Sequence, residues 1–529
     1  MSSKLLALMV SLPFFSVLAA GAQTTPTQPP QTQTPPPAAQ SQQQAKPDAK
    51  PDKRPETHIT PAQAKDLFAS VGQILQFAST DTDLPIKHAV KSKLTTRVDV
   101  EKYLVTKLND DKDAKRMERS EIVLKKFGLI DPDFQLKSFM VTLLDEQIAA
   151  FYDSKTKTVN LLDWIDPDSQ KPVLAHELTH ALQDQMVNLD KWENQTSDDI
   201  SHNYAEDVKH VSTDEDDTAR EAVLEGQAMA VFVDYSLAPK HISLRTAPEL
   251  IEGLVNNLAD SGDSPVLDRA PLLLQESLLF PYKDGLKFEA TVMADDKDPA
   301  AAYAGVLNRP PDTSYEIMNP RAWEHHAKVP LLHMPDIHPV IGAAWDPYDI
   351  GVMGELDVRI LAKLFGGDQA AAELTPAWDG GIYYAAQRKD APDKDSTASV
   401  ALLYLSQWKS PDAAADFVKM YANELGKKYT KVTRDTNAET SPNEQVYQTS
   451  EGPALIVISG NDVFVSESFD LTTARKLQLL MLGAQQGGDN AVADLSMPDR
   501  RPVMGNDLAG NMVRFMARCG VMKAALPRH

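Results

Sequence analysis

The segment His176-Glu177-Leu178-Thr179-His180 restricts the fold of this chain more than any other stretch of its sequence. On an α-helix, residues four apart lie one turn apart on the same face, so His176 and His180 would project side by side. A helical wheel places Asp184 in the same polar sector, and apolar residues fill the opposite side: Leu174, Leu178, Ala181, Leu182 and Met186. The pattern predicts a helix with one face toward a core and the other toward a cleft.

The residues of the polar face suit a metal centre. Two neutral imidazoles at this spacing can coordinate one Zn²⁺ at about 2.0–2.1 Å. Zinc lowers the pKa of a bound water toward about 7. Glu177 stands beside the first imidazole, where its carboxylate can take the proton of that water and pass it to a departing amine. We therefore predict His176 and His180 as zinc ligands and Glu177 as the general base.

A zinc site of this type needs a third protein ligand, and the segment 219–228 offers two candidates. The segment is typical of a second helix, with Glu221 and Glu225 on one face. Either carboxylate could complete a site of two histidines and one glutamate. A third histidine six residues after His180 is excluded, because that position is Met186.

The His-Glu-Leu-Thr-His segment, taken together with Leu224-Glu225-Gly226-Gln227-Ala228, resembles the gluzincin branch of the zincin metallopeptidases. In that branch the second helix often carries Glu-Gly-x-Ala, with its glutamate as zinc ligand, which corresponds to Glu225 here. A thermolysin-like alignment would instead make Glu221 the zinc ligand, with Glu225 as a neighbour that supports the ligands without binding zinc itself. We favour Glu225. The resemblance implies a zinc-dependent hydrolase that cleaves peptide bonds.

A longer stretch, 144–323, is similar to uncharacterised secreted bacterial metallopeptidases. The similarity rests on 175–185 around the motif, and on the segments 280–285 and 310–314. After the segment that corresponds to 310–314, such sequences often carry a histidine directly before the next proline. This chain departs from that pattern, because the residue before Pro320 is Asn319.

Several further positions allow two interpretations. The segments 150–153 and 158–162 are expected to be short strands around the polar turn 154–157. The segment 149–153, or its hairpin partner, could bind an extended peptide as an added strand, or be an ordinary sheet strand. Asp184 could orient a ligand histidine or cap the helix. The acidic run 214–217 could be a calcium loop or a solvated helix start, and we expect the helix start. A second metal site could be formed by His325, His326, His333 and His338, but their irregular spacing favours surface or packing residues. A donor for the substrate oxygen could come from any of four residues: Tyr204, Tyr315, His325 and His326.

The start of the chain predicts export. Lys4, the apolar run 5–19 and the small residues 20–22 are typical of a secretory signal cleaved near Ala22. An uncleaved membrane anchor is the alternative, although the apolar run is shorter than a bilayer span. We expect a secreted or periplasmic protein with no stable membrane insertion after cleavage.

Charge and cysteine content exclude other classes. The formal net charge of −22 leaves no basic surface for nucleic acid. Cys519 is the only cysteine, so neither a disulfide within the chain nor a cysteine zinc site can form. The resemblance to metallopeptidases implies a peptide or protein substrate as the partner. The oligomeric state is not indicated by the sequence.

The predicted fold class is α+β, with a mostly helical zincin-like core that includes a small sheet, plus a C-terminal α+β module. The Pro- and Gln-rich linker cannot offset its ordering entropy and should be disordered. The helical lead-in could be an inhibitory pro-region or part of the core, and we favour the core. The C-terminal module could bind substrate or cover the cleft. The predicted division is 1–22 signal peptide, 23–58 linker, 59–140 helical lead-in, 141–370 metallopeptidase core, 371–485 α+β module and 486–529 irregular tail.

Two other functions use the same residues. One is a catalytically silent binding protein on a zincin scaffold, and the other is a cell-envelope scaffold with a structural metal. A structural site needs the ligands but not the base, so the presence of Glu177 favours the peptidase.

Overall fold

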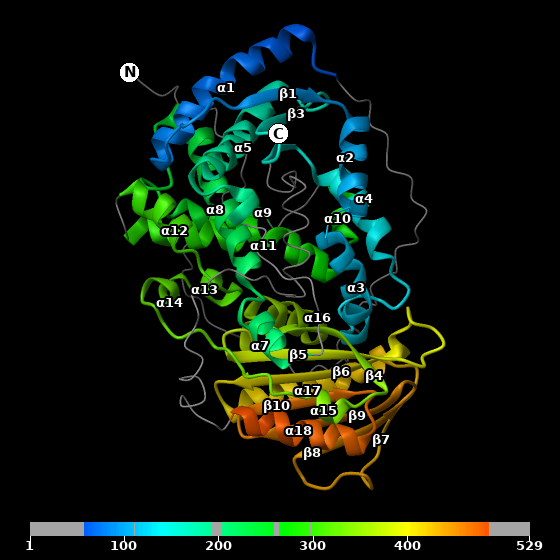
Figure 1. Ribbon diagram of the computed structural model, residues 1–529. Coiled ribbons are helices and arrows are strands. Elements are labelled where there is room, and N and C mark those ends of the chain that lie inside the picture. The colour runs from blue at the N-terminus through cyan, green and yellow to red at the C-terminus, as the bar shows by residue number, and fades with distance from the viewer. Residues whose placement is uncertain (1–57, 111, 193–202, 259–263, 296–297, 486–529) are drawn as a thin grey trace, which may run out of the picture. The chain divides into compact units, whose positions relative to one another are not determined.

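The computed structural model describes residues 58–485, apart from 111, 193–202, 259–263 and 296–297 (Figure 1). The expected signal peptide, the linker up to residue 57 and the tail 486–529 lie outside the described residues. The described residues all belong to one compact unit, 53–529. They form an α+β fold with a three-stranded and a seven-stranded sheet, as predicted. No helix in these ranges is long and apolar enough to cross a bilayer.

The helical lead-in contributes to the same core as the motif helix. Helix α1 (Pro61–Thr82) begins with a capping box between Thr60 and Gln63, and its apolar face is buried against α5 (Pro167–Val187). Strand β1 (Lys91–Thr95) pairs in parallel with β3 of the small sheet. The remaining lead-in helices are α2 (Arg97–Asp110), α3 (Lys112–Phe127) and α4 (Leu136–Gln147).

The small sheet lies directly before the motif helix in the chain. Its hairpin has the predicted bounds, with β2 (Ala150–Asp153) antiparallel to β3 (Thr158–Leu162). The strand order is β1-β3-β2, so β2 lies at an edge of the sheet. Asp166 caps α5 by accepting from the N–H groups of Asp168 and Ser169.

Three long helices form the centre of the helical part: α5, α8 (Asp216–Leu237) and α11 (Leu272–Asp295). Helix α8 packs against both of the others (Figure 1). The shorter helices around them are α6 (Leu189–Trp192), α7 (Tyr204–Ser212), η1 (Ala238–Lys240), α9 (Leu250–Leu258), α10 (Pro265–Asp268), the π-helix η2 (Ala301–Gly305), α12 (Val306–Asn308), α13 (Ser314–Met318), α14 (Pro320–Glu324) and α15 (His338–Ile341).

Helices α8 and α11 touch at two glycines. A Cβ atom on Gly226 would overlap with the backbone carbonyl of Gly285, and one on Gly285 would overlap with the carbonyl oxygen of Ala222. The two backbones can therefore approach this closely only because both positions lack a side chain. Gly226 directly follows Glu225, so this contact also helps to place the predicted third ligand.

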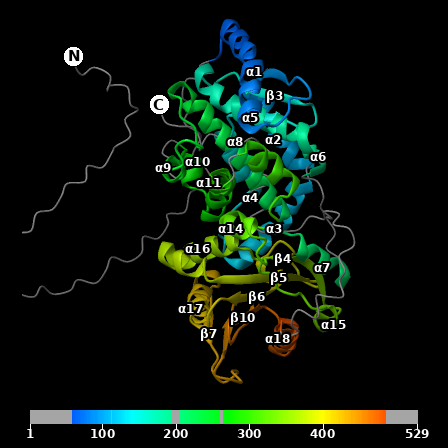
Figure 2. The ribbon, with the colours of Figure 1, turned by 90° about the vertical axis from the view of Figure 1, so that its left-hand side faces the viewer.

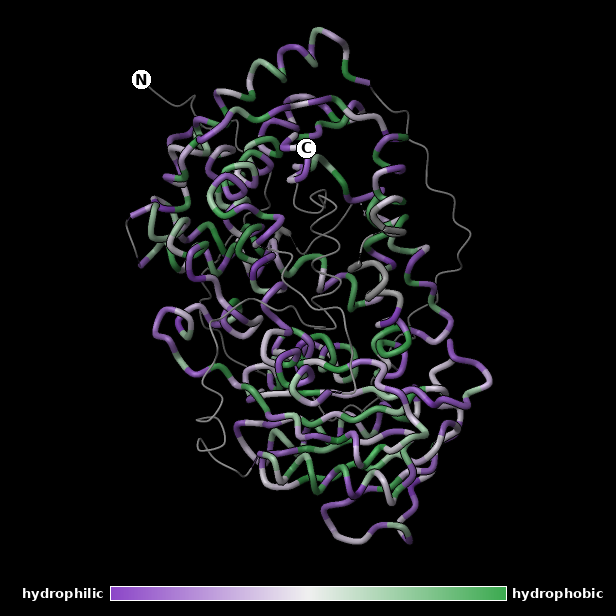
Figure 3. Tube along the Cα trace, viewed as in Figure 1, coloured by the Kyte–Doolittle hydropathy of each residue, from purple (hydrophilic) through white to green (hydrophobic). Residues whose placement is uncertain are grey.

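The seven-stranded sheet is antiparallel throughout, in the order β4-β5-β6-β10-β9-β8-β7. Alternate residues of its central strands enter two different cores, with Tyr383 in one and Tyr384 in the other. Helix α17 covers one face and α18 the other (Figure 2), and the central strands are mostly hydrophobic (Figure 3). The elements are β4 (Trp345–Val352), α16 (Glu355–Leu374), β5 (Trp378–Arg388), η3 (Thr397–Ser399), β6 (Val400–Trp408), α17 (Pro411–Lys428), β7 (Val432–Arg434), β8 (Glu444–Thr449), β9 (Gly452–Ser459), β10 (Asp462–Glu467) and α18 (Leu471–Gln485).

One strand of this sheet departs from the sequence prediction. The segment 141–370 is predicted to be a mostly helical core with a small sheet of its own, but its residues 345–352 form the edge strand β4 of the seven-stranded sheet. Pro347 lies at an irregularity in its pairing with β5. An edge strand tolerates proline, because one side of its backbone needs no partner strand.

The carboxyl groups of Asp81 on α1 and Asp234 on α8 lie close enough for their charges to interact. Burial raises the pKa of Asp81 to about 7, the charge of Asp234 adds to this, and Arg245 opposes it. Burial likewise raises the pKa of Asp234 to about 6. A carboxyl whose pKa is raised by folding stabilises the fold in its protonated form. That contribution is complete below the ordinary aspartate pKa of 3.8 and is lost as the pH rises through about 7.

We predict that Gly285→Ala lowers the free energy of unfolding by about 1–3 kcal/mol, because the new methyl group would force α8 and α11 apart. Gly253→Ala is the matched control, since Gly253 also lies in a helix but has nothing within 4 Å of its Cβ position. That change should be neutral or stabilise by about 0.5–1 kcal/mol. Denaturant unfolding of both variants measures the difference, and equal stabilities would contradict the glycine contact.

We predict that the free energy of unfolding of Asp81→Asn rises by about 1–2 kcal/mol relative to that of the wild type between pH 5 and pH 8. The reason is that only the wild type must ionise a buried carboxyl over this range. Asp66→Asn, at an exposed position of α1, is the control and should follow the wild type. Thermal unfolding across the pH range tests this, and parallel curves for Asp81→Asn and wild type would refute it.

Candidate metal centre

Three side chains from two helices converge on one point. The Nε2 atoms of His176 and His180 lie 3.0 Å apart. Oε2 of Glu225 lies 3.0 Å from Nε2 of His176 and 3.6 Å from Nε2 of His180. Among the described residues, these three form the group of His, Cys, Asp and Glu side chains that could hold a metal ion. The structure thus brings together the predicted ligand set.

The spacing of the donor atoms fits a small tetrahedral cation. Ligands at about 2.0–2.1 Å from a tetrahedral zinc are separated from one another by roughly 3.3 Å. The three separations in this site lie on either side of that value. The residues therefore fit the metal that the motif implies.

The motif helix is buried on both sides, which corrects the predicted open polar face. His176 is 1% exposed, Glu177 2% and Gln183 0%. The reason is that α8 packs along this face of α5. The side chain of His180 is the most accessible of the three ligands, at 13%.

The charges of the site stabilise one another. Burial would raise the pKa of Glu225, but the two imidazoles outweigh it and lower that pKa to about 2. Burial disfavours charge on His180 too, but Glu225 and Glu177 outweigh it and raise its pKa to about 10. The pKa of His176 is lowered by burial, which Glu225 opposes. A cation at this point would take the place of the proton that the raised pKa of His180 favours on its imidazole.

Glu177 lies beside the three ligands without being one of them. Burial raises the pKa of its carboxyl to about 7, partly opposed by the charge of His180. A hydrogen bond from the backbone N–H of Tyr152 holds the carboxylate. Glu177 is therefore tied to the edge strand β2 and can exchange a proton near neutral pH.

Three residues at the site were not predicted as functional. The ring of Tyr282 stacks on that of His176, with centroids 6.4 Å apart. Nδ1 of His180 lies 2.8 Å from Oε1 of Gln183, and Nε2 of Gln183 lies 3.0 Å from Oε1 of Gln227. Gln183 and Tyr282 stand in the segments 175–185 and 280–285, which are similar to bacterial metallopeptidases, but their residue types gave no further signal. No local pattern marks a glutamine as the partner of a ligand.

Other candidates have different surroundings. Glu221 lies one turn before Glu225 on α8 and is not part of the converging group. Asp184 accepts from the hydroxyl of Tyr152 at 2.7 Å, from Lys157 and from the N–H of Leu189, so it fastens the end of α5 to the hairpin. Asn319 donates to the carbonyl of Tyr315 and to Glu355.

The suggested oxygen donors and the histidines of 325–338 also have other neighbours. Tyr204 is 43% exposed, and Tyr315 packs against Trp378. His325 is exposed. His326 contacts Arg309, and His338 pairs with Asp207 and Asp336.

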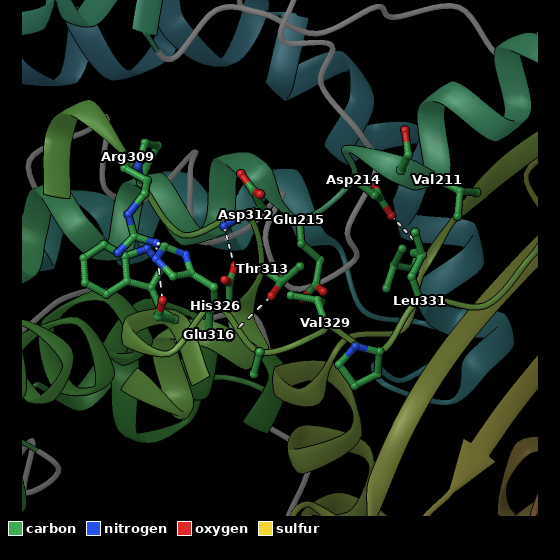
Figure 4. Close-up of a pocket in the computed structure, with 16 residues that line it drawn as sticks. Val211, Asp214, Glu215, Arg309, Asp312, Thr313, Glu316, His326, Val329 and Leu331 are labelled. Carbon is green, nitrogen blue, oxygen red and sulfur yellow. Dashed lines mark hydrogen bonds between the residues drawn. The ribbon is translucent and has the colours of Figure 1, made fainter. Parts of the chain in front are cut away.

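The acidic run 214–217 is buried, so the predicted solvated helix start is wrong. Asp214 accepts from the N–H of Val352, and Glu215 accepts from the N–H and hydroxyl of Ser314. Both carboxylates line a cavity of about 410 Å³ (Figure 4). The guanidinium of Arg309 lies 3.8 Å from the ring centroid of Trp323 at its wall. None of the three converging ligands lines this cavity.

We predict that Glu225→Gln weakens binding of a divalent metal more than about a hundredfold, because the neutral amide loses the anionic donor of the site. Glu221→Gln is the matched control one turn away and should bind metal like the wild type. Chelator competition with both purified variants decides between the two carboxylates. Loss of metal from Glu221→Gln alone would overturn the assignment.

Comparison of the chain with family models, with curated proteins and with solved structures finds no match in any of the three. The candidate metal centre therefore rests on its own donors alone: two imidazoles one turn apart on α5 and one carboxylate on α8, which together could hold a metal ion.

Proposed function

We propose that this chain is a secreted or periplasmic zinc-dependent peptidase. The observation that carries the proposal is the convergence of His176, His180 and Glu225, with the carboxylate of Glu177 buried beside them. Two histidines, one glutamate and an adjacent base form the set of groups that metal-assisted peptide hydrolysis requires. The resemblance to gluzincins supports the same reaction.

Zinc is the metal that this donor set suits best, since imidazole and carboxylate ligands in a tetrahedral arrangement favour it. When bound, it would act as a Lewis acid on the scissile carbonyl and would lower the pKa of a water to about 7. His176, His180 and Glu225 would hold it. The remaining chemistry belongs to residues of the chain.

Glu177 is the proposed general base. A carboxyl with a pKa of about 7 is divided between its two protonation states near neutral pH, so it can both accept and return a proton. In the proposed reaction it takes the proton of the attacking water and delivers it to the leaving amine. The N–H of Tyr152 keeps the carboxylate in place between these two steps.

Strand β2 is the proposed docking site for the substrate backbone. It pairs with β3 on one side and ends the sheet on the other, so an extended peptide could add to its free edge. Because Tyr152 belongs to this strand and also contacts Glu177, a peptide bound there would lie next to the base. The strand would thus align the substrate with the catalytic residues.

A structural metal centre is the second candidate. The observation that favours it is burial, since closed sites with little solvent access are typical of structural zinc. The side chains of His176 and Glu225 are 1% and 5% exposed. A scaffold of this kind would retain the metal and show no hydrolysis.

We predict that Glu177→Gln keeps zinc at the wild-type stoichiometry and lowers the rate of peptide hydrolysis by about 10²–10⁴-fold, because it removes the base but no ligand. The assay follows the digestion of a denatured protein mixture by mass spectrometry, with zinc measured on the same samples. Asp168→Asn, at an exposed position of the same helix, is the control for mutation as such.

The outcomes separate the two candidates. Zinc-loaded wild type that cleaves nothing in the mixture would contradict the peptidase and support the structural centre. A Glu177→Gln variant that cleaves as fast as wild type would show that this residue is not the base.

A further inference from the structure

A chain of two buried glutamines leads from η2 to His180, and its direction is determined at the η2 end. Nε2 of Gln227 lies 3.3 Å from the carbonyl oxygen of Ala302 and 3.1 Å from that of Tyr303. Carbonyl oxygens only accept hydrogen bonds, so the amide nitrogen of Gln227 must face them. Its Oε1 must therefore point the other way, toward Gln183.

The same reasoning determines the orientation of Gln183. Its Nε2 donates to Oε1 of Gln227 at 3.0 Å and to the carbonyl of Leu224 at 3.1 Å, and both of these oxygens are acceptors. Its own Oε1 is then left facing Nδ1 of His180 at 2.8 Å. An oxygen that only accepts requires a proton on Nδ1.

We propose that Gln183 and Gln227 are positioning residues that set the tautomer of His180 for metal binding, with the carbonyls of Ala302 and Tyr303 as the fixed end of the chain. With one proton held on Nδ1, Nε2 is the nitrogen that faces His176 and Glu225 and that would give up its proton to a metal bound there. The inference rests on metal occupancy of this site and not on the reaction.

The second glutamine is needed because the first could flip. A primary amide presents either its oxygen or its nitrogen to a neighbour, and the two orientations have almost the same shape. A flipped Gln183 would donate to Nδ1 and favour the proton on Nε2, which cannot then coordinate. Gln227 prevents this flip, because its Oε1 and the carbonyl of Leu224 both require the Gln183 nitrogen.

The helix that supplies the fixed carbonyls has unusual geometry. Ala301–Gly305 forms a π-helix, which is rare in proteins and frequently occurs at functional sites. Both glutamines are fully buried, so water does not compete for their hydrogen bonds. The tautomer of His180 thus depends on backbone more than a hundred residues further along the chain.

Zinc titration against a chelator tests the inference with methionine variants, which keep the volume of glutamine but cannot hydrogen-bond in its place. Gln183→Met and Gln227→Met should each weaken zinc binding by about tenfold to a hundredfold. The double variant should bind no more weakly than Gln183→Met alone, because the two residues act in series. Gln227 contacts none of the three metal-site residues, so a loss of zinc affinity in Gln227→Met is stronger evidence for the chain than the same loss in Gln183→Met.

Gln170→Met is the matched control. Gln170 is equally buried on α5 and bonds to the backbone of Leu162 and Ile165, away from the metal ligands. It should lower the melting temperature of the metal-free protein and leave zinc affinity within about twofold. Wild-type affinity in Gln227→Met, additive losses in the double variant, or an equal loss in Gln170→Met would each overturn the inference. A wild type that binds no zinc would instead remove the proposed function.

Discussion

The backbone contact between Gly226 and Gly285 positions Glu225, the third residue of the candidate metal centre. Helices whose side chains separate them cannot approach as closely as α8 and α11 do at this crossing. Glu225 directly precedes Gly226, so the rotation of α8 that brings its glycine onto α11 also decides which residues face α5. On α11, Asp284 precedes Gly285 and forms a bidentate pair with Arg359 of α16, at 3.1 and 2.9 Å. One glycine contact thus links the metal centre to the packing of three helices.

The second constraint is the concentration of ionisable groups inside the core. A buried charge destabilises a fold unless it is paired and hydrogen-bonded. Glu225 meets both imidazoles, and the glutamine chain satisfies the far nitrogen of His180. Because the polar face of α5 has these partners on α8, it can be buried rather than left in a cleft. The helical wheel fails here because it assumes that a polar face meets water.

Features that depend on local residues could be predicted from the sequence. The motif histidines follow from helical spacing, and the hairpin of β2 and β3 follows from two short apolar runs around a polar turn. Spacing alone left Glu221 and Glu225 as equal candidates, because both share one face of α8. The resemblance favoured Glu225, and the structure brings that residue to the histidines.

The remaining features depend on partners that are remote in the chain. The burial of Asp214 requires Val352, 138 positions later, and the role of Gln227 requires Ala302, 75 positions later. Strand β4 carries a proline and takes its strand geometry from pairing with β5. The proline interrupts the alternation of apolar and polar residues, so the sequence of the segment does not by itself predict a strand. The residues next to these positions in the sequence do not indicate contacts with such distant segments, so sequence patterns could not predict them.

Of the residues at the site, Glu177 is the one that the stability of the fold explains least. A structural centre uses only its ligands, and the carboxyl of Glu177 is not among them. Burying that carboxyl raises its pKa to about 7, which means that ionising it at neutral pH works against folding. An uncharged glutamine of nearly the same volume would avoid this penalty and could still accept the N–H of Tyr152. A fold under selection for stability alone would have no reason to keep a titrating carboxyl there, whereas a site that moves protons beside a metal requires one.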